Sequence, residues 1–593
     1  MSFSHFPPVP TGLSAGLAIH SNFAPNAFAD LFTAVSGRLF PGVPLASPCF
    51  GVGAENENGL LHRSGTNQYL NETFRADIFG AFINTQWETC QATGAQCLLD
   101  SANTTNPKAT SASEACEQGS IPSHFIDVRD AQDVAAAFTF SEKTGIPLSI
   151  AARLQGSKQC PKLVGAVGAF SSISSRKQTV IKTQSGWQMH NLKNMSYHPA
   201  FVPEGCSLAQ PAATFGAGVQ WAEAYEFADA HNITLVGGSD RTVGVVGGWL
   251  QGGGHGVLSN TMGLGVDRVL QFRVVTPDGK LRVANACQNE DLFFALRGGG
   301  GGTFGVVLEA TLLASPPVTL QAVIVSWSST SPNRTLTAEL WKILTNNGLK
   351  WAGEGWGGFS MSEIAILVNP VLDSEQAAAS MAPLVEFGAR LKQDGVEGAE
   401  TVVTTFPSFL AFFNAFTLEH VASVGTNLAL SSRLIPKSLL STPETQTQLV
   451  DALQATNDAG PGMIILLVPP VSYAAYQENS TSVTEAWRSS VYHVTAVASW
   501  AWNATSAEKR AAYQDAGKAI GNLRRITPDA AYSNEADVYE PNHEVSFWGS
   551  NYQELLRIKR KYDPRQLLDC WQYEWDREGM HFMPVQQPNN HFR

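Results

Sequence analysis

Glycine is concentrated in one short part of this chain. Of the 52 glycines among 593 residues, 18 lie between Gly237 and Gly305, a stretch of 69 residues. The stretch has no Gly-X-Y period and no Ser- or Gln-rich spacer composition, which excludes collagen, a flexible linker and a disordered tail. Glycine gathered inside a hydrophobic, foldable sequence instead indicates close approach of the backbone to other backbone or to a ligand.

Length and charge narrow the class of protein further. With 593 residues, 44% of them hydrophobic, the chain exceeds what one core usually holds, so we expect two or more domains. A net charge of −12 argues against binding to nucleic acid or to an anionic membrane surface. The apolar run 463–468 is stopped by two prolines and falls far short of the roughly 18 residues of a membrane-spanning helix. We therefore expect no membrane insertion.

The cysteines and glycosylation patterns leave the cellular compartment open. Eight cysteines allow disulfides, and Cys90 and Cys97 are close enough to close a small loop, with scattered buried thiols as the alternative. Asn-X-Ser/Thr patterns, of which chance gives about four, suggest a glycoprotein of secretory ancestry. They begin at Asn71, Asn103, Asn194, Asn232, Asn333, Asn479 and Asn503. The first basic residue is Arg38, so the start does not resemble a signal peptide.

Strands and helices alternate before and inside the glycine-rich stretch. Asp130 is a plausible N-cap for a helix that ends at Gly145-Ile146-Pro147. The pattern predicts strands at 125–128, 148–150, 214–218, 233–236, 269–275 and 304–313, helices at 130–145, 220–231 and 289–297, and a turn at 277–279. This alternation is typical of α/β units.

The sequence changes in character from about residue 318 to 528. Amphipathic helices are predicted at 338–345, 374–393 and 506–522, and apolar strands at 323–327, 364–368, 463–468 and 491–499. We interpret this as a second, α+β domain. Its many aromatic residues suit a pocket for an apolar or aromatic substrate, although most of them should be core.

The two glycine runs differ in what precedes them. Gly298–Gly302 follows a helix and comes before a strand, which is the wrong order for a dinucleotide-binding loop and indicates a helix stop with close packing. No Gly-Lys-Ser/Thr follows any cluster, so a P-loop is excluded. The stretch from Gly237 to His255 follows a predicted strand, and its unhindered N–H groups could cradle phosphates and a flat ring.

These stretches resemble the FAD-linked oxidases of the vanillyl-alcohol-oxidase superfamily, in the berberine-bridge-enzyme-like, fungal (isoamyl alcohol oxidase-like) branch. The similarity is carried by GGSDRTVGVVGGWLQGGGHGVLSN from residue 237, NEDLFFALRGGGGGTFGVV from 289, YSNEAD from 532 and NYQELLRIKRKYDP from 551. LNETFRADIFGAFINTQWETC from residue 70 is also typical of the fungal branch. The resemblance covers most of the chain.

The resemblance implies an α+β architecture with a two-subdomain α/β FAD-binding domain and a substrate domain containing an antiparallel sheet. It implies an N-terminal arm over 1–40, the FAD-binding domain over 41–317, the substrate domain over 318–528, and a C-terminal segment over 529–593 that completes the FAD domain. A monomer is expected.

The resemblance also implies site residues. The loop from Ser239 to Gly254 should line the FAD pyrophosphate and flavin ring. Residues 305–306 should offer backbone contacts to the flavin or adenine, and Asn534 should lie near the flavin ring. The implied cofactor-binding residues are Gly238, Ser239, Asp240, Thr242, Gly244, Gly247, Gly248, Gly253, Gly254, Leu258, Gly305, Val306 and Asn534. Tyr532 is the candidate acid/base, with Glu535, Asp537 and His493 as further candidates.

Two departures from the family pattern concern how FAD is held. Many relatives attach FAD through a histidine and a cysteine, but Asp240 occupies the position of the linking cysteine. The segment after Ile150, which should supply the first phosphate loop, contains no histidine as far as Gly186. Either the chain has diverged to noncovalent FAD or residues 151–185 reflect a gene-model irregularity. We therefore predict noncovalent FAD.

The resemblance implies an FAD-dependent oxidoreductase that transfers hydride from a small or medium-sized apolar or aromatic alcohol, or from a secondary-metabolite intermediate, to flavin N5, with O2 as acceptor. Two alternatives stay open: a flavin-containing scaffold for redox-neutral cyclisation, and a degenerate, non-catalytic paralogue. No clustered metal, nucleophilic-serine or glycosidase motif is visible, so no metal is expected.

Overall fold

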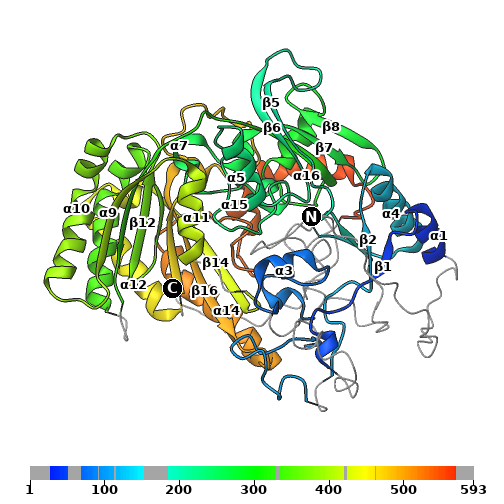
Figure 1. Cartoon of the computed structure of the whole chain (residues 1–593), viewed down its shortest axis with the longest axis horizontal. Coiled ribbons are helices and arrows are strands. Elements are labelled where there is room, and N and C mark those ends of the chain that lie inside the picture. Colours follow the sequence, from blue (N-terminus) through cyan, green and yellow to red (C-terminus); the bar gives the residue numbers. More distant parts are fainter. Residues whose placement is uncertain are drawn as a thin grey trace, which may run out of the picture.

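A computed structural model describes residues 27–50, 68–90, 93–111, 115–151, 185–328, 333–419, 424–460 and 462–568. These residues form three sheets of four, five and seven strands, with helices between and around them (Figure 1). The result is the mixed α+β architecture that the sequence predicts.

The four-stranded sheet contains the first predicted strand–helix–strand unit. Its order is β1 (Leu39–Pro41), β2 (His124–Asp127), β4 (Ser185–Gln188) and β3 (Leu148–Ala151). The helix α4 (Ala131–Thr144) begins where the Asp130 carboxylate accepts two backbone N–H bonds and ends at Gly145, whose φ of 69° is left-handed. The helix α1 (Ala27–Ala34) packs on α4 and buries Leu31, so the described part of the expected arm is held against this unit.

The five-stranded sheet carries the glycine-rich stretch. Its order is β5 (Met195–Phe201), β6 (Gln210–Gly216), β9 (Val306–Leu313), β7 (Val269–Val275) and β8 (Leu281–Asn285), with every pair antiparallel. The helices α5 (Trp221–Ala230) and α8 (Glu290–Leu296) agree with the sequence prediction. The strand predicted at 233–236 is wrong, because Thr234 forms only an isolated bridge with Ser315.

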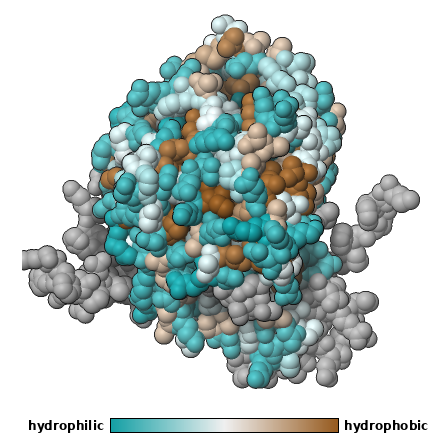
Figure 2. Space-filling view, turned by 90° about the vertical axis from the view of Figure 1, so that its left-hand side faces the viewer, coloured by the Kyte–Doolittle hydropathy of each residue, from teal (hydrophilic) through white to brown (hydrophobic). Residues whose placement is uncertain are grey.

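The seven-stranded sheet is antiparallel throughout. Its order is β13 (Glu400–Phe406), β10 (Leu320–Ser326), β12 (Ile364–Asn369), β11 (Gly357–Ser360), β15 (Gly462–Leu467), β16 (Ser490–Trp500) and β14 (Asn427–Pro436). Four long helices accompany it: α9 (Arg334–Gly353), α10 (Ser374–Gln393), α12 (Pro443–Ala459) and α14 (Ser506–Arg524). Figure 2 looks onto the side of the molecule that carries α9 and α10, where hydrophobic residues appear as spots within a mainly hydrophilic surface.

The two faces of this sheet pack against different parts of the chain. On β16, Tyr492 and Val494 lie in the core under the long helices. His493 lies between them in sequence, so its side chain points to the opposite face. On that face, Phe359 of β11 shares a core cluster with Leu250 of the glycine-rich stretch. The sheet therefore presents His493 toward the glycine-rich stretch.

The C-terminal segment returns to the first half of the chain. The helix α16 (Tyr552–Tyr562) packs against α8, where Lys561 Nζ and Tyr562 Oη bind the two carboxylate oxygens of Asp291 at 2.6 and 2.9 Å. A shorter helix, α15 (His543–Trp548), precedes it. The C-terminal segment therefore contacts the first half of the chain at α8.

Disulfides join Cys97 to Cys116 and Cys206 to Cys287. The Cys90–Cys97 loop that the sequence allowed does not form, since Cys97 pairs with Cys116 and Cys90 remains a thiol. Within the described ranges, none of the helices combines the length and apolarity needed to cross a membrane.

Candidate functional site

The stretch from Gly237 to Gly256, here called the glycine loop, folds tightly onto itself. A Cβ on Gly256 would lie 1.9 Å from the carbonyl oxygen of Gly237, so the two ends of the loop meet backbone to backbone. The Trp249 indole packs across Gly254, whose φ of 75° is left-handed. The short helix α6 (Gly248–Gln251) lies between these contacts. Glycine here serves close packing of protein against protein.

The C-terminal segment is bonded directly to this loop. The Asn534 Nδ2 group donates to the carbonyl of Gly248 at 2.9 Å and to the Tyr532 hydroxyl at 2.6 Å. The Gly254 N–H also donates to the Tyr532 hydroxyl, at 3.3 Å, and that hydroxyl faces the Trp249 carbonyl at 3.5 Å. Two residues predicted to share the site, Tyr532 and Asn534, therefore lie together on the glycine loop.

Three ionisable side chains meet beside Tyr532. Glu535 accepts from His255 Nε2 at 3.0 Å through Oε1 and from His493 Nε2 at 2.8 Å through Oε2. His255 belongs to the glycine loop, His493 to β16 and Glu535 to the C-terminal segment. We call this group the His–Glu–His cluster. It joins the predicted residues His493 and Glu535 to a residue that the sequence analysis did not single out.

Burial and charge set the protonation of the His–Glu–His cluster. The His493 side chain is fully buried, and burial lowers its pKa below the ordinary value. Burial alone would raise the pKa of the Glu535 carboxyl, but the two imidazoles outweigh it and hold that pKa well below its usual range. The carboxylate is therefore ionised near neutral pH, beside a neutral His493 ring.

Aromatic and aliphatic side chains line one side of the cluster, while the Glu535 side chain stays 27% exposed. The Trp487 ring lies 5.6 Å from that of His493 and 5.5 Å from that of Tyr532, measured between centroids. A small core around them also contains Leu264, Val266, Leu434, Val468 and Val483. This apolar wall strengthens the electrostatic interactions inside it.

Most of the remaining predicted residues lie along the glycine loop. The Gly238 carbonyl accepts from Tyr225, Ser239 is exposed, and the Asp240 carboxylate accepts from both the N–H and the hydroxyl of Thr242 at 2.8 Å. Asp240 thus forms a local turn where the family pattern has a cysteine.

The other predicted residues lie further along the chain. Gly244 forms a bridge with Gln220. Gly247 and Gly248 begin α6, and Gly253 and Leu258 are buried after this helix. Gly305 and Val306 lie at the start of β9, against Val274 and Val275.

The second glycine run is tied to the first. The Gln251 carbonyl accepts from the N–H groups of Gly298 and Gly300, at 3.0 and 3.1 Å. A Cβ on Gly298 would lie 2.4 Å from the Val483 nitrogen, and Gly298 has a φ of 132°. The structure therefore supports the interpretation of this run as a helix stop and close-packing element.

Two buried polar atoms at the glycine loop, Trp221 Nε1 and Gln251 Oε1, have no hydrogen-bond partner among the described residues. A third such atom, Ser149 Oγ, lies on β3, at the edge of the four-stranded sheet. Such atoms are costly unless a ligand or water satisfies them, so the surroundings fit a polar cofactor such as FAD. The predicted first phosphate loop, within 151–185, lies almost entirely outside the described residues.

Asp537, a further acid/base candidate, lies in a different network. Its carboxylate pairs with Arg524 at 3.1 Å, and Arg524 also pairs with Glu540. Arg433, whose side chain is 1% exposed, binds the other oxygen of Glu540 at 2.8 Å. Asp537 therefore supports the C-terminal segment and does not join the His–Glu–His cluster.

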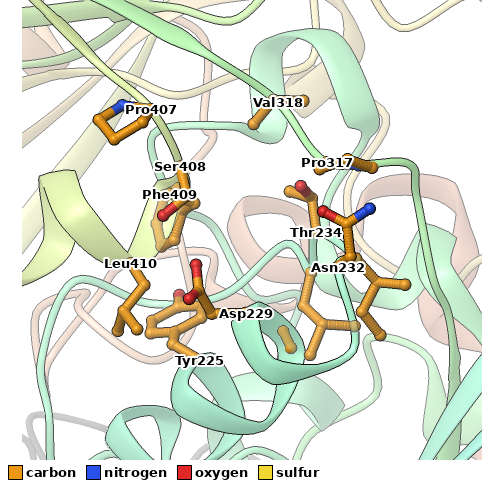
Figure 3. A pocket seen from close by; sticks show the side chains of 13 residues that line it. Tyr225, Asp229, Asn232, Thr234, Pro317, Val318, Pro407, Ser408, Phe409 and Leu410 are labelled. Carbon is orange, nitrogen blue, oxygen red and sulfur yellow. The ribbon is translucent and has the colours of Figure 1, made fainter.

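A separate small pocket lies beside α5, close to the start of the glycine loop. It is lined by α5 and the turn after it, by Pro317 and Val318, and by residues 407–410 at the start of α11 (Phe409–Glu419), as Figure 3 shows. Tyr225 belongs to this wall and also donates to the Gly238 carbonyl. None of its lining residues is a histidine, and its one carboxylate is Asp229, so it offers no acid/base pair.

His255 is the functional candidate that sequence reasoning missed. It is the first non-glycine residue after three glycines, and a histidine within such a loop is a usable signal. Its meaning depends on His493 and Glu535, which lie more than 200 residues further along the chain.

Comparison with known proteins agrees with this geometry. A family model described as "FAD binding domain" matches residues 204–285, which include the glycine loop. A second, described as "Berberine and berberine like", matches residues 531–570, which include Tyr532, Asn534 and Glu535. The first match begins after the unusual segment 151–185.

Similar proteins align over nearly the whole chain. The FAD-linked oxidoreductase ffsJ of Aspergillus flavipes is 35% identical, with 93% of this chain and 92% of that protein covered. The FAD-linked oxidoreductase OXR2 of Pyricularia oryzae is 37% identical, with 92% of each covered. The crystal structure of the VAO-type flavoprotein MtVAO615 from Myceliophthora thermophila matches with a TM-score of 0.75 at 25% identity, over 95% of this chain and 96% of that one.

A more distant structure shares the fold alone. Glucooligosaccharide oxidase from Acremonium strictum matches with a TM-score of 0.57 at 19% identity, over 77% of this chain and 92% of that one.

Proposed function

Because the chain belongs to the berberine-like, VAO-type family of FAD-linked oxidoreductases, we propose that it oxidises an apolar or aromatic alcohol, or a secondary-metabolite intermediate, with O2 as electron acceptor. The substrate loses two electrons and two protons and becomes a carbonyl compound, while O2 becomes hydrogen peroxide. FAD, when bound, supplies the hydride acceptor. The chain itself must hold the cofactor, orient the alcohol and accept the hydroxyl proton.

The observation that carries the proposal is the environment of the Tyr532 hydroxyl. Two N–H groups, from Asn534 and Gly254, point at this one oxygen at 2.6 and 3.3 Å. Hydrogen bonds to an oxygen favour its negatively charged form. Tyr532 is therefore suited to accept a proton from an alcohol and return it later. Proton transfer of this kind contributes about 10²–10⁴-fold to a rate.

His493 and Glu535 have supporting roles in this proposal. When neutral His493 donates its Nε2–H to the Glu535 carboxylate, Nδ1 is left as the acceptor of the ring. Nδ1 is buried and has no partner among the described residues. His493 can therefore orient the Glu535 carboxylate beside Tyr532, whose ring centroid lies 5.8 Å from that of His493.

We propose that FAD is bound without a covalent link. The glucooligosaccharide oxidase from Acremonium strictum is described as carrying a 6-S-cysteinyl, 8α-N1-histidyl FAD. In this chain Asp240 cannot form a thioether, and its carboxylate is engaged with Thr242. The residues proposed to hold FAD are the glycine loop, Asn534 and the backbone at 305–306.

The surroundings of the cluster support an apolar substrate. Trp487, Val483 and Leu434 belong to the wall around His493 and Tyr532, and they offer dispersion contacts and no charge. A small molecule with a hydroxyl at its end would bring one polar group to Tyr532 and leave the remainder in apolar contact. We propose that the protein acts on such molecules as a monomer.

The test uses the purified protein with its bound flavin. Anaerobic mixing with a panel of apolar and aromatic alcohols should bleach the visible flavin band, and adding O2 should restore it with release of hydrogen peroxide. Tyr532→Phe should slow bleaching by about 10²-fold or more. Tyr513→Phe, a buried tyrosine of α14, is the matched control and should bleach at the wild-type rate.

Other outcomes would favour the alternatives. A yellow protein that converts a substrate without bleaching favours a redox-neutral scaffold, and a colourless protein that resists reconstitution with FAD favours a degenerate paralogue. Equal bleaching by wild type and Tyr532→Phe would refute the assignment of Tyr532.

A further inference from the structure

The His–Glu–His cluster also has the composition of a metal site. His255 Nε2, His493 Nε2 and the Glu535 carboxylate are contributed by three separate segments, and their ligand atoms all lie within 4.8 Å of one another. Two imidazoles and one carboxylate are the protein ligands of many catalytic zinc sites, where the fourth position stays open. No sequence motif predicts these three ligands together, because they are far apart along the chain.

The spacing of the ligand atoms suits a zinc-sized ion. Zinc binds imidazole nitrogen and carboxylate oxygen at about 2.0–2.2 Å in tetrahedral geometry, which puts neighbouring ligand atoms about 3.3 Å apart. In the cluster, the two nitrogen–oxygen separations are 3.0 and 2.8 Å. The ligand atoms all lie within 4.8 Å of one another, so an ion could reach all three after a small rearrangement of the cluster. Both histidines already present Nε2 toward the shared carboxylate.

The charges around the cluster favour binding of a cation. In the described part of the chain, the ion pairs of Glu535 are with His255 and His493 alone. Nearby arginines are committed elsewhere: Arg433 binds Glu540, and Arg488 binds Asp267 through two bonds of 2.7 Å. A partly exposed carboxylate beside an apolar wall, with no lysine or arginine partner among the described residues, is well suited to a divalent ion.

We propose that His255, His493 and Glu535 bind one divalent ion of the zinc type, and that the bound ion inhibits the enzyme. The ion would bind the Glu535 carboxylate and both Nε2 atoms, with the hydrogen of each ring moved to Nδ1. It would place a positive charge beside Tyr532, where the alcohol is proposed to bind. The inhibition rests on the proposed function of the cluster, whereas binding does not.

How tightly the ion is held depends on the hydrogen bonds made by its ligands. Histidine ligands of tightly held metals usually donate their second ring N–H to a protein group, and losing that bond costs about 10–100-fold in affinity. The Nδ1 atom of His493 has no such partner among the described residues. The ion should therefore be removable by dialysis against a chelator.

The binding experiment uses the purified flavoprotein after chelator treatment. Calorimetric titration with ZnCl2 should give about one ion per chain. Glu535→Gln, which removes a charged ligand without changing its shape, should weaken zinc binding at least about tenfold. His231→Asn removes an exposed imidazole outside the cluster and should bind zinc as the wild type does. An unchanged affinity in folded Glu535→Gln would overturn the site.

A second measurement needs no variant. X-ray absorption at the zinc edge of the wild-type protein should report only nitrogen and oxygen ligands, with imidazole scattering. Sulfur ligation would instead assign the ion to cysteine, such as the described thiols Cys49 and Cys90, and would refute the proposal. Failure of the folded wild type to bind zinc would also refute it.

An activity measurement tests inhibition by zinc separately from zinc binding. Zinc should lower the rate of flavin bleaching by substrate, and a chelator should restore it. Bound zinc with unchanged bleaching would overturn the inhibition and leave the proposed oxidation intact.

Discussion

Replacing Gly252 by alanine perturbs the contact that holds the C-terminal segment on the glycine loop. Gly252 has φ −91° and ψ −8°, a conformation that alanine adopts freely, so any effect comes from the added methyl group. That Cβ would lie 2.4 Å from Oδ1 and 2.6 Å from Nδ2 of Asn534. Both atoms are buried and fixed, so the amide must move.

The cost follows from the bonds that the amide would lose. The Asn534 Nδ2 group donates to the Gly248 carbonyl at 2.9 Å and to the Tyr532 hydroxyl at 2.6 Å. Each hydrogen bond contributes about 0.5–1.5 kcal/mol, and a buried group left unpaired costs about 1–3 kcal/mol. The gain from replacing glycine by alanine, about 0.5–1 kcal/mol in a helix, offsets part of this. We expect Gly252→Ala to destabilise the protein by about 2–4 kcal/mol.

The assay has two readouts. The midpoint of denaturant unfolding, followed by tryptophan fluorescence, should fall, and the flavin content per chain should fall with it because the loop loses its clamp. Gly521→Ala in α14 is the matched control, since nothing lies within 4 Å of its added Cβ. Wild-type stability and flavin content in Gly252→Ala would refute the role of Asn534 as the anchor of the loop.

Three further predictions concern charge and cofactor attachment. Glu540→Gln should cost about 3–5 kcal/mol in denaturant unfolding, because it leaves the buried Arg433 guanidinium without its closest carboxylate; a loss below about 1 kcal/mol would contradict this. Burial raises the pKa of Asp291, but Lys561 and the other hydrogen bonds to its carboxylate together outweigh burial and hold that pKa below its usual value. The ion pair with Lys561 therefore stabilises the fold above about pH 4, and the stabilisation is lost as the pH falls through the lowered pKa. Asp291→Asn should therefore lower stability by about 1 kcal/mol at pH 7 and by less near pH 3 in thermal unfolding, and an equal loss at both would contradict the sign. Acid precipitation should leave the flavin in the supernatant, whereas a yellow pellet would refute noncovalent binding at Asp240.

Local signals made much of the first half predictable from sequence. The strand at 269–275 has the predicted bounds, and Asp130 and Gly145 cap α4 as their residue types indicate. The predicted strand at 233–236 failed for a tertiary reason. Ile233 and Val236 are buried in the core, and an apolar run of four residues that packs this way looks like a strand without pairing as one.

The candidate site was only partly predictable. Tyr532 and Asn534 could be placed near the glycine loop because family motifs carry both. His255 could not be linked to Glu535 from sequence, since that contact depends on how β16 and the C-terminal segment meet the loop. The strand β14, which pairs with β16 over ten positions, was also not anticipated. Polar residues on its sequence, such as Ser431 and Arg433, obscure an apolar strand pattern yet are buried in the fold.

The Cys206–Cys287 disulfide makes the FAD-binding stretch a covalent ring. It closes a separation of 81 residues that contains β6, α5, the glycine loop, β7 and β8, nearly the range matched by the FAD-binding model. In the chain-entropy model, a ring of this size disfavours the unfolded state by about 4–5 kcal/mol. The order of disulfide formation and FAD binding then matters. A chain whose disulfide forms before FAD binds samples far fewer unfolded conformations. In a reduced chain, the free energy of FAD binding must offset this conformational entropy without the disulfide. Reductant should thus slow reconstitution with FAD although neither cysteine belongs to the glycine loop.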